Sequence, residues 1–314
     1  MEEKKVLLLV NKDFEYAGYR AGVEYQMTAG KTPNVTLVKR DTRTGPNKYD
    51  PSCIYDITQG QHKFNVREYC ISYLFNEGEN TSNSEIKFGH LEKLISTEKP
   101  DFVISVSTSE STYESQENFE SINGCVIMGH RFYARDCREF ESSKPSKLPV
   151  DADWMSSDNF LNENFFNSLN ANNGVLSQGM EVVPSKAFKY PRILPDDKNV
   201  SLGVINIVDY YLYKKADKRT YEDFIESKLE GIPVGLETTH GVIRMAVDKV
   251  FQDSAVKIPV LFVSPIVDRY LCFDEDVDDR WGMQNKVASY NAGVAVINML
   301  EHIFAQSNSF LTND

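Results

Sequence analysis

Three carboxylates stand where buried strands are expected to end. Glu15 follows the apolar run KVLLLV, Glu237 ends the segment GIPVGLE, and Asp268 ends IPVLFVSPIVD. In α/β folds, ligand chemistry lies at the carboxyl ends of the strands, and carboxylates there can act as general acids or bases. An acid near a core is costly unless something binds it. Three acids spread over the whole chain therefore predict one site assembled from distant strands; the alternative is three solvated loop acids.

The composition limits the classes of partner. The chain has 314 residues, of which 41% are hydrophobic and 11% aromatic, enough for a large core in one α/β domain or two smaller ones. Lys and Arg number 34 against 46 Asp and Glu, which gives a formal charge of −12. A strongly acidic chain without a basic run is poorly suited to nucleic acid or to an anionic membrane surface. We therefore expect neither partner.

The cysteines, histidines and N-terminal segment point to a cytoplasmic protein without a metal site. Five cysteines are odd in number and form no CxxC pair, which favours reduced thiols. Five histidines show no ligand spacing such as HExxH. The apolar run near the N-terminus is too short for a signal-peptide core, and no stretch approaches the length of a membrane span.

The hydrophobic pattern predicts strands that alternate with helices. Short apolar runs without alternation predict strands buried on both faces of a sheet: Val6–Val10, Val35–Lys39, Phe102–Val106, Gly124–Met128, Val204–Val208, Val234–Glu237 and Val260–Ser264. Helical spacing of apolar residues falls at Glu85–Ser96, Asn159–Leu169, Tyr221–Leu229, Thr239–Phe251 and Lys286–Phe304. This alternation predicts a three-layer α/β/α fold with a central mixed sheet.

Two regions lack the pattern. Asp41–Phe75 contains Pro, Gly, Asn and many polar residues, and we expect a hairpin excursion or a partner-facing loop there. Arg138–Asn199 is polar and irregular apart from one helix. Because no Gly/Ser linker and no internal repeat is present, the sequence favours a single domain, residues 1–314, with insertions near 41–80 and 138–199.

Five segments occur in an order that resembles a known superfamily. They are KPDFVIS at 99–105, NGCVIMGHRFYARD at 123–136, LGVINIVDYYL at 202–212, GIPVGLETTHGVIRMA at 231–246 and IPVLFVSPIVD at 258–268. They resemble the purine nucleoside phosphorylase and nucleosidase superfamily, most closely its methylthioadenosine/S-adenosylhomocysteine nucleosidase branch. The resemblance covers most of the chain. It implies a nucleoside phosphorylase-like fold that hydrolyses the N-glycosidic bond of a purine nucleoside or nucleotide derivative, with no cofactor.

The resemblance also implies roles for individual residues. Glu15 would activate water, and Asp268 would protonate the leaving purine as a general acid. Glu237 would accept two ribose hydroxyls, although Gly235 replaces the first Glu of the family's segment. The remaining substrate-binding positions that the resemblance implies are Leu236, Tyr211, Leu212 and Thr108, with Tyr211 stacking on the base. His240, early on a helix, is expected to be structural.

The segment after Phe102–Val106 departs from the family pattern. The family has a Gly-rich loop there, and this chain has Val106-Ser107-Thr108-Ser109-Glu110-Ser111. Glycines allow close approach and positive φ, which Ser and Glu do not. Glu110 adds negative charge where a phosphorylase would hold phosphate, which favours water as the nucleophile. A phosphate-dependent phosphorylase and a non-catalytic nucleoside-binding protein on the same fold remain the alternatives, since fold does not fix function.

The segment Arg131-Phe132-Tyr133 bears on assembly. It follows a strand at a place where members of the resembled family contact a partner subunit. Large aromatic side chains exposed after a strand require cover, so we expect a homodimer with this segment at or near the interface. In the alternative, Phe132 and Tyr133 pack beneath the chain's own segment 138–199.

Overall fold

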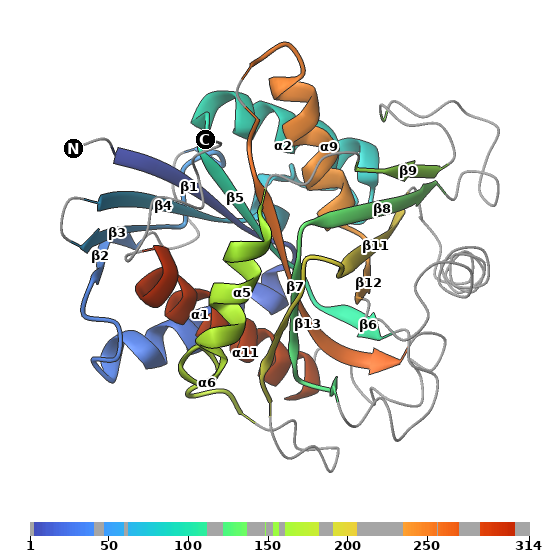
Figure 1. Cartoon of the computed structure of the whole chain (residues 1–314). Coiled ribbons are helices and arrows are strands. Elements are labelled where there is room, and N and C mark those ends of the chain that lie inside the picture. The colour runs from blue at the N-terminus through green and yellow to red at the C-terminus, as the bar shows by residue number, and fades with distance from the viewer. Residues whose placement is uncertain are drawn as a thin grey trace.

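The computed structural model describes residues 3–40, 47–59, 62–111, 122–136, 148, 153–156, 161–181, 191–205, 235–255, 257–269 and 283–304 (Figure 1). Two of the expected substrate-binding residues, Tyr211 and Leu212, and the expected helix Tyr221–Leu229 lie outside these residues.

Among the described residues, thirteen strands form one mixed sheet. From edge to edge they are β2 (Val35–Arg40), β3 (Cys53–Gln59), β4 (His62–Cys70), β1 (Glu3–Val10), β5 (Phe102–Val106), β13 (Val260–Arg269), β6 (Ser109–Ser111), β12 (Gly235–Glu237), β11 (Val200–Ile205), β8 (Arg131–Asp136) and β9 (Asp153–Met155). Off this path, β7 (Val126–Gly129) pairs with β13 and with β10 (Ile193–Pro195). The central strands β4, β1, β5 and β13 are parallel.

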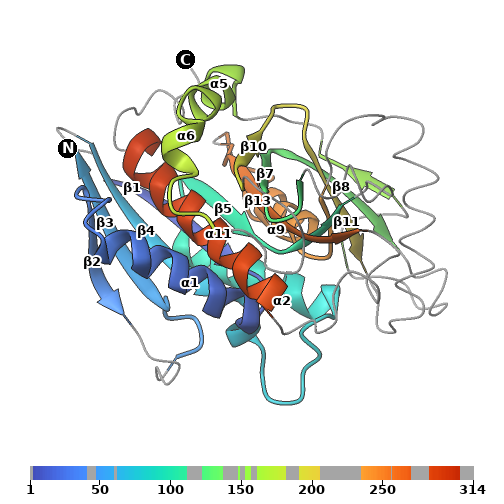
Figure 2. The ribbon, with the colours of Figure 1, turned by 90° about the horizontal axis from the view of Figure 1, so that it is seen from below.

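Helices cover both faces of the sheet (Figure 2). One face carries α1 (Asp13–Thr28), α5 (Glu163–Ala171), α6 (Asn173–Leu176), α11 (Met283–Met299) and the π-helical turn η3 (Leu300–Phe304). The other carries α2 (Ser84–Glu98) and α9 (His240–Phe251), and a 3-10 turn, η1 (Ile71–Leu74), follows β4. Successive residues of β1 alternate between two hydrophobic clusters, Val6 and Leu8 in one, Leu7 and Leu9 in the other. The predicted three-layer α/β/α fold is confirmed.

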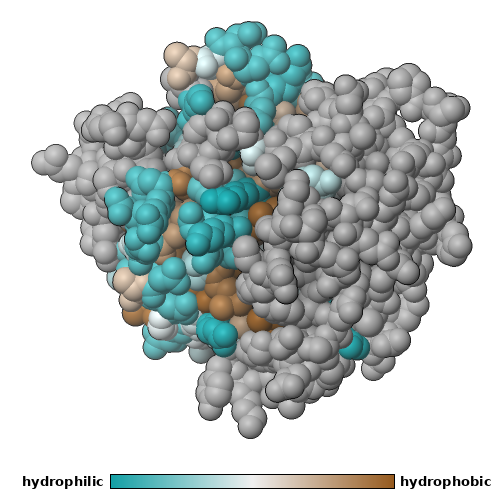
Figure 3. All heavy atoms as spheres, turned by 45° about the vertical axis from the view of Figure 1, so that its right-hand side comes forward, coloured by the Kyte–Doolittle hydropathy of each residue, from teal (hydrophilic) through white to brown (hydrophobic). Residues whose placement is uncertain are grey.

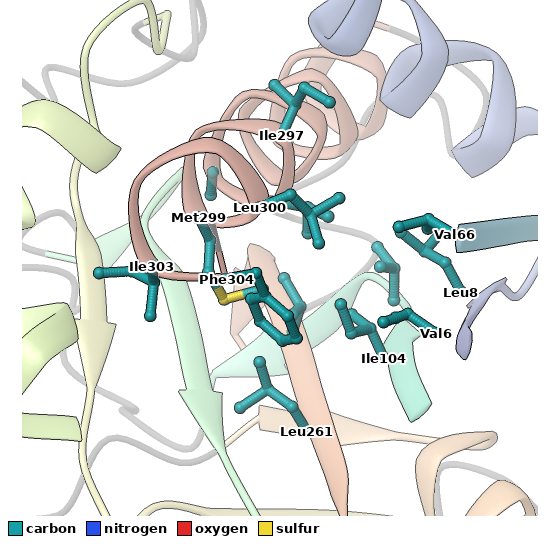
Figure 4. Close-up of a cluster of buried hydrophobic side chains, with 14 of the residues drawn as sticks. Val6, Leu8, Val66, Ile104, Leu261, Ile297, Met299, Leu300, Ile303 and Phe304 are labelled. Atoms are coloured by element: carbon teal, nitrogen blue, oxygen red, sulfur yellow. The ribbon is translucent and has the colours of Figure 1, made fainter. Parts of the chain in front are cut away.

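The larger core lies beneath the end of α11 (Figure 4). Leu300 and Phe304 lie over the strand residues Val6, Ile104 and Leu261, and all five side chains are at most 3% exposed. Burying side chains of this size contributes about 1.5–3 kcal/mol each. This contact fixes the C-terminal helix on the central strands, which in turn position the residues at the strand ends.

The prediction for Asp41–Phe75 is half right. β3 and β4 do form an antiparallel hairpin, but β4 also pairs in parallel with the whole length of β1, so it belongs to the interior of the sheet. Phe64 and Val66 on β4 are buried, while Asn65 and Arg67 between them are partly exposed. That period of two is the pattern of a half-buried strand, and the polar residues concealed it. The single-domain organisation with insertions stays a prediction.

The aromatic segment expected at a subunit interface is also part of the core. Phe132 on β8 is fully buried, and its ring centroid lies 5.7 Å from that of Phe262 on β13. Tyr133 is 6% exposed. Phe132 itself is therefore covered by β13 and by the helices on that face, while the place of the segment near an interface stays a prediction. The homodimer itself stays a prediction.

Figure 3 shows the surface of one face of the molecule. Where described residues reach the surface in Figure 3, hydrophilic side chains predominate, with hydrophobic residues visible between them. Within the described ranges, no helix combines the length and the apolar character that a membrane crossing requires.

Candidate active site

The segment expected as a loop after β5 brings the three acids together. Its second half is strand β6, which lies between β13 and β12, beside the arrowhead of β13 in Figure 1. Glu110 on β6 pairs with Asp268 on one side and with Leu236 on the other. Thr108, directly before β6, contacts Glu15. One short segment therefore connects Glu15, Asp268 and the strand that ends at Glu237.

Glu15 lies in the first turn of α1 rather than at the strand exit itself. Its Oε1 accepts hydrogen bonds from the backbone N–H of Thr108 at 2.9 Å, from Thr108 Oγ1 at 2.5 Å and from Ser107 Oγ at 3.5 Å. Its Oε2 accepts the backbone N–H of Lys12 at 2.8 Å. An acid in the first helical turn is favoured by the helix dipole. Burial raises the pKa of Glu15, while the bonds from Thr108 and Lys12 oppose that rise.

Glu237 ends β12 and caps the start of α9. Its carboxylate accepts the backbone N–H of Thr239, the backbone N–H of His240 at 3.0 and 2.9 Å to its two oxygens, and Ser201 Oγ at 3.1 Å. A helix N-terminus is a natural site for an anion, so the sequence E-T-T-H places the acid where four donor contacts meet. Burial raises the pKa of Glu237 to about 7, although these backbone donors and the charge of Lys87 oppose the rise.

Asp268 directly follows a β-bulge in strand β13. Ile266 on β13 pairs with Ser109 and Asp268 pairs with Glu110, so Val267 is an extra residue in the ladder. Bulges of this kind redirect side chains and are common beside active sites. Asp268 is 1% exposed and Glu110 7%. The strand register therefore brings two buried acidic residues side by side.

A buried lysine that the sequence reasoning missed connects two of the acids. Lys87 on α2 is 1% exposed, and its Nζ donates to Asn11 Oδ1 at 3.1 Å and to Thr239 Oγ1 at 2.7 Å. Burial lowers its pKa to about 7, with repulsion from Lys12 adding to the effect and attraction by the two acids opposing it. A signal was present, because Lys87 stands four residues before Leu91 and so lies on the apolar stripe of its helix.

Comparison with known proteins establishes which fold positions these groups. No protein-family model and no curated protein matches the sequence. The structure is similar to a methylthioadenosine/S-adenosylhomocysteine nucleosidase of Neisseria meningitidis, with TM-score 0.50, 12% identity, and coverage of 95% of this chain and 99% of that one. It is also similar to a methylthioadenosine nucleosidase of Arabidopsis thaliana, with TM-score 0.51, 11% identity, and coverage of 99% of this chain and 97% of that one.

A third neighbour is the putative nucleosidase of Borrelia burgdorferi, with TM-score 0.50, 12% identity, and coverage of 94% and 98%. The chain shares its fold with these nucleosidases. At this level of identity the likeness establishes the nucleosidase fold alone, so the chemistry has to be argued from the residues of this chain.

Within the nucleosidase fold, the structure describes three further residues that the sequence analysis named: Thr108, Leu236 and His240. Thr108 holds Glu15, and Leu236 is buried in β12 beside Glu110. His240 joins two strands, with Nδ1 2.5 Å from Ser105 Oγ and Nε2 3.0 Å from Ser264 Oγ. Burial and the nearby Lys87 lower its pKa to about 3, so it is neutral at physiological pH. In the part of the chain that the structure describes, no three His, Cys, Asp or Glu side chains are grouped to hold a metal ion.

Proposed function

We propose that this chain hydrolyses the N-glycosidic bond of a purine nucleoside or nucleotide derivative. The observation that supports it most is the segment 107–111, whose Thr108 binds Glu15 and whose Glu110 pairs with Asp268 and with the neighbour of Glu237. The ligands of two fold neighbours agree with this substrate class: the Neisseria protein was solved with methylthio-immucillin-A and the Borrelia protein with adenine.

Asp268 is the proposed general acid. Breaking the bond between the sugar carbon and the base nitrogen leaves an electron pair on the base, and the proton of Asp268 neutralises it. Glu110, the neighbour of Asp268 in the strand register, adds a second acidic residue beside it. Because Glu110 pairs in register with Asp268, we assign Glu110 to the site itself, in addition to the repulsion of phosphate expected from its charge.

Glu15 is the proposed general base. Its raised pKa suits a group that takes a proton from water near neutral pH. Among the described contacts, Oε2 accepts the Lys12 N–H, which uses one of its two lone pairs and leaves the other for a water proton. The water oxygen then bonds to the sugar carbon as the base leaves, with one carboxylate on each side of the reacting bond.

Glu237 is the proposed ribose ligand. Each of its two carboxylate oxygens already accepts two internal hydrogen bonds, so a sugar hydroxyl has to replace one of these bonds. The His240 N–H is shared between both oxygens and can remain on one while the other accepts a hydroxyl. A carboxylate held in this way orients the sugar and favours its cation-like transition state.

Phosphate in place of water is the second candidate, because two amino groups lie on the Glu15 side of the site. Lys87 is buried there, and Lys12 Nζ donates to Thr81 Oγ1 at 2.9 Å and to Ser82 Oγ at 3.2 Å. Lysines of this kind can bind phosphate as point charges. The negative charge of Glu110 favours water, which makes hydrolysis the first choice.

A panel of nucleosides and nucleotides, incubated with and without phosphate, tests the proposal. We expect release of free purine and free sugar without phosphate, and a rate about 10²–10⁴ lower in Asp268→Asn, the usual contribution of a general acid. An absolute need for phosphate, with sugar 1-phosphate as product, would establish the second candidate. Binding without base release would indicate a non-catalytic nucleoside-binding protein, and equal rates for Asp268→Asn and wild type would remove Asp268 from the mechanism.

We further propose that this activity belongs to a cytoplasmic homodimer. Support for the compartment comes from the cysteines: among the described residues, Cys53, Cys70 and Cys125 are buried thiols, as is usual where thiols stay reduced.

A further inference from the structure

We propose that Lys87 is a positioning residue of the site: its buried amino group ties the carboxylates of Glu15 and Glu237 into one hydrogen-bonded network and supplies positive charge between them. The catalytic part of this inference rests on the proposed function. The structural part does not, because it concerns two buried acids and the cation between them.

The network can be followed atom by atom from Lys87 toward Glu15. Nζ donates to Asn11 Oδ1 at 3.1 Å, and Asn11 Nδ2 donates to Ser107 Oγ at 3.2 Å. Ser107 Oγ in turn donates to Glu15 Oε1 at 3.5 Å. Asn11 directly follows β1 and Ser107 directly follows β5, so the chain of bonds crosses the ends of two neighbouring strands.

On the other side the network is shorter. Nζ donates to Thr239 Oγ1 at 2.7 Å, and the backbone N–H of Thr239 donates to Glu237 Oε2. Lys87 is thus linked to Glu15 through Asn11 and Ser107, and to Glu237 through Thr239. Since α2 packs against α9, the helix that carries Lys87 also covers the turn that holds Glu237.

The charges around Lys87 come from two directions. Lys12 and Glu15 lie on the β1–α1 side, and Glu237 and His240 lie on the β12–α9 side. His240 is neutral, so the local balance is two acids against two lysines. The side chain of Lys12 bonds to Thr81 and Ser82 near the surface, whereas Lys87 is 1% exposed. Solvent therefore screens the attraction between Lys87 and the two acids less than it screens that of Lys12.

This arrangement predicts different stabilities for a single and a double variant. An unpaired buried charge is strongly destabilising, while removal of both members of a buried pair is often tolerated. Lys87→Met keeps the apolar stem and removes the charge. Lys87→Met combined with Glu237→Gln removes the charge of Lys87 together with that of Glu237, the acid to which it is linked through one residue. Lys249→Met, on the exposed side of α9, is the matched control, because Lys249 contacts only Gln252 at 3.4 Å among its described hydrogen bonds.

The first experiment measures thermal unfolding against pH and needs no substrate. In Lys87→Met the buried carboxylates keep a proton to higher pH than in the wild type, whose unfolded chain still binds the Lys87 proton. The wild type therefore gains stability relative to the variant as pH rises, by the linkage of proton binding to folding. From about pH 5.5 to about pH 8.5 the Tm of Lys87→Met should fall progressively behind that of the wild type.

Four outcomes of this experiment decide the structural part. A Tm deficit in Lys87→Met that grows with pH, with a smaller growth when the same change is made in Glu237→Gln and a constant offset in Lys249→Met, supports the proposal. Equal growth in both backgrounds overturns it, because the growth would then come from the proton of Lys87 alone. A deficit that does not change with pH overturns it, because the charge of Lys87 would then have no influence on the acids. If Lys87→Met does not fold at neutral pH, the double variant decides: recovery of the fold supports the proposal, and continued failure to fold overturns it.

The second experiment uses any substrate that releases base. We expect the acidic limb of the pH profile of kcat/KM to move up by about 1–3 pH units in Lys87→Met, because an opposite charge of this kind shifts a carboxylate by that amount. Lys87→Arg keeps the charge and should leave the limb closer to the wild type. An unmoved limb overturns the catalytic part. If no substrate is found, the proposed function fails while the unfolding experiment still decides the role of Lys87.

Discussion

At the scale of single residues, the site is unusual in how fully its acids are engaged by the protein. Glu15 accepts hydrogen bonds from Thr108, Ser107 and Lys12, and Glu237 accepts them from Thr239, His240 and Ser201. These donors fix the position of each carboxylate before any substrate arrives, which lowers the cost of organising the transition state. They also require that a substrate exchange one internal bond for each new one.

Glu237→Gln tests the ribose contact. The amide cannot accept from both backbone N–H groups and a hydroxyl as the carboxylate does, so charge-assisted bonds become neutral or are lost. We expect kcat/KM for ribosides to fall roughly 10- to 100-fold, which corresponds to hydrogen bonds with a charged group. Paired assays with 2′-deoxy substrates serve as the control, since these should be poor for the wild type and lose less in the variant. Equal affinity of the wild type for both sugars would contradict this role.

At the scale of elements, the contact between α1 and α11 decides how closely two layers of the fold approach. A Cβ on Gly22 of α1 would lie 2.2 Å from the carbonyl oxygen of Tyr290 on α11. Because that oxygen is backbone, Gly22→Ala should lower stability by about 1–3 kcal/mol, the usual effect of overpacking. Gly89→Ala on the exposed face of α2, where no atom lies within 4 Å of the new Cβ, should instead raise it by about 0.5–1 kcal/mol. Thermal unfolding of the two variants gives opposite shifts if the helices are in contact at Gly22, and shifts of the same sign contradict the contact.

At the scale of the whole molecule, assembly and core packing can now be separated. Phe132 is buried against Phe262, so truncation to alanine would cost about 3–5 kcal/mol within one subunit. Light scattering of the wild type should give the mass of a homodimer. Phe132→Leu should keep that mass while its Tm falls. A Phe132→Leu protein that is monomeric with an unchanged Tm would return this residue to the interface, and a monomeric wild type would contradict the homodimer.

Much of the architecture was readable from the chain because its signals are local. Strands such as Phe102–Val106 are continuous apolar runs, and α9 and α11 show helical spacing, so both element types and their alternation follow from sequence alone. The three acids were also readable, since each stands at or just after a buried run. β4 and β6 were missed, because a polar alternating strand and a three-residue strand resemble loops until their partners are known.

The sequence by itself determined the three-layer fold and which carboxylates are candidates for chemistry, since both depend on residue type and short-range periodicity. Only the tertiary structure decided how those carboxylates are connected. Lys87 is remote in sequence from Asn11 and Thr239, and Glu110 meets Asp268 only through the register of β6 on β13. Contacts of this kind arise when distant strands pair and helices pack across them, and no local pattern encodes which charges then face one another.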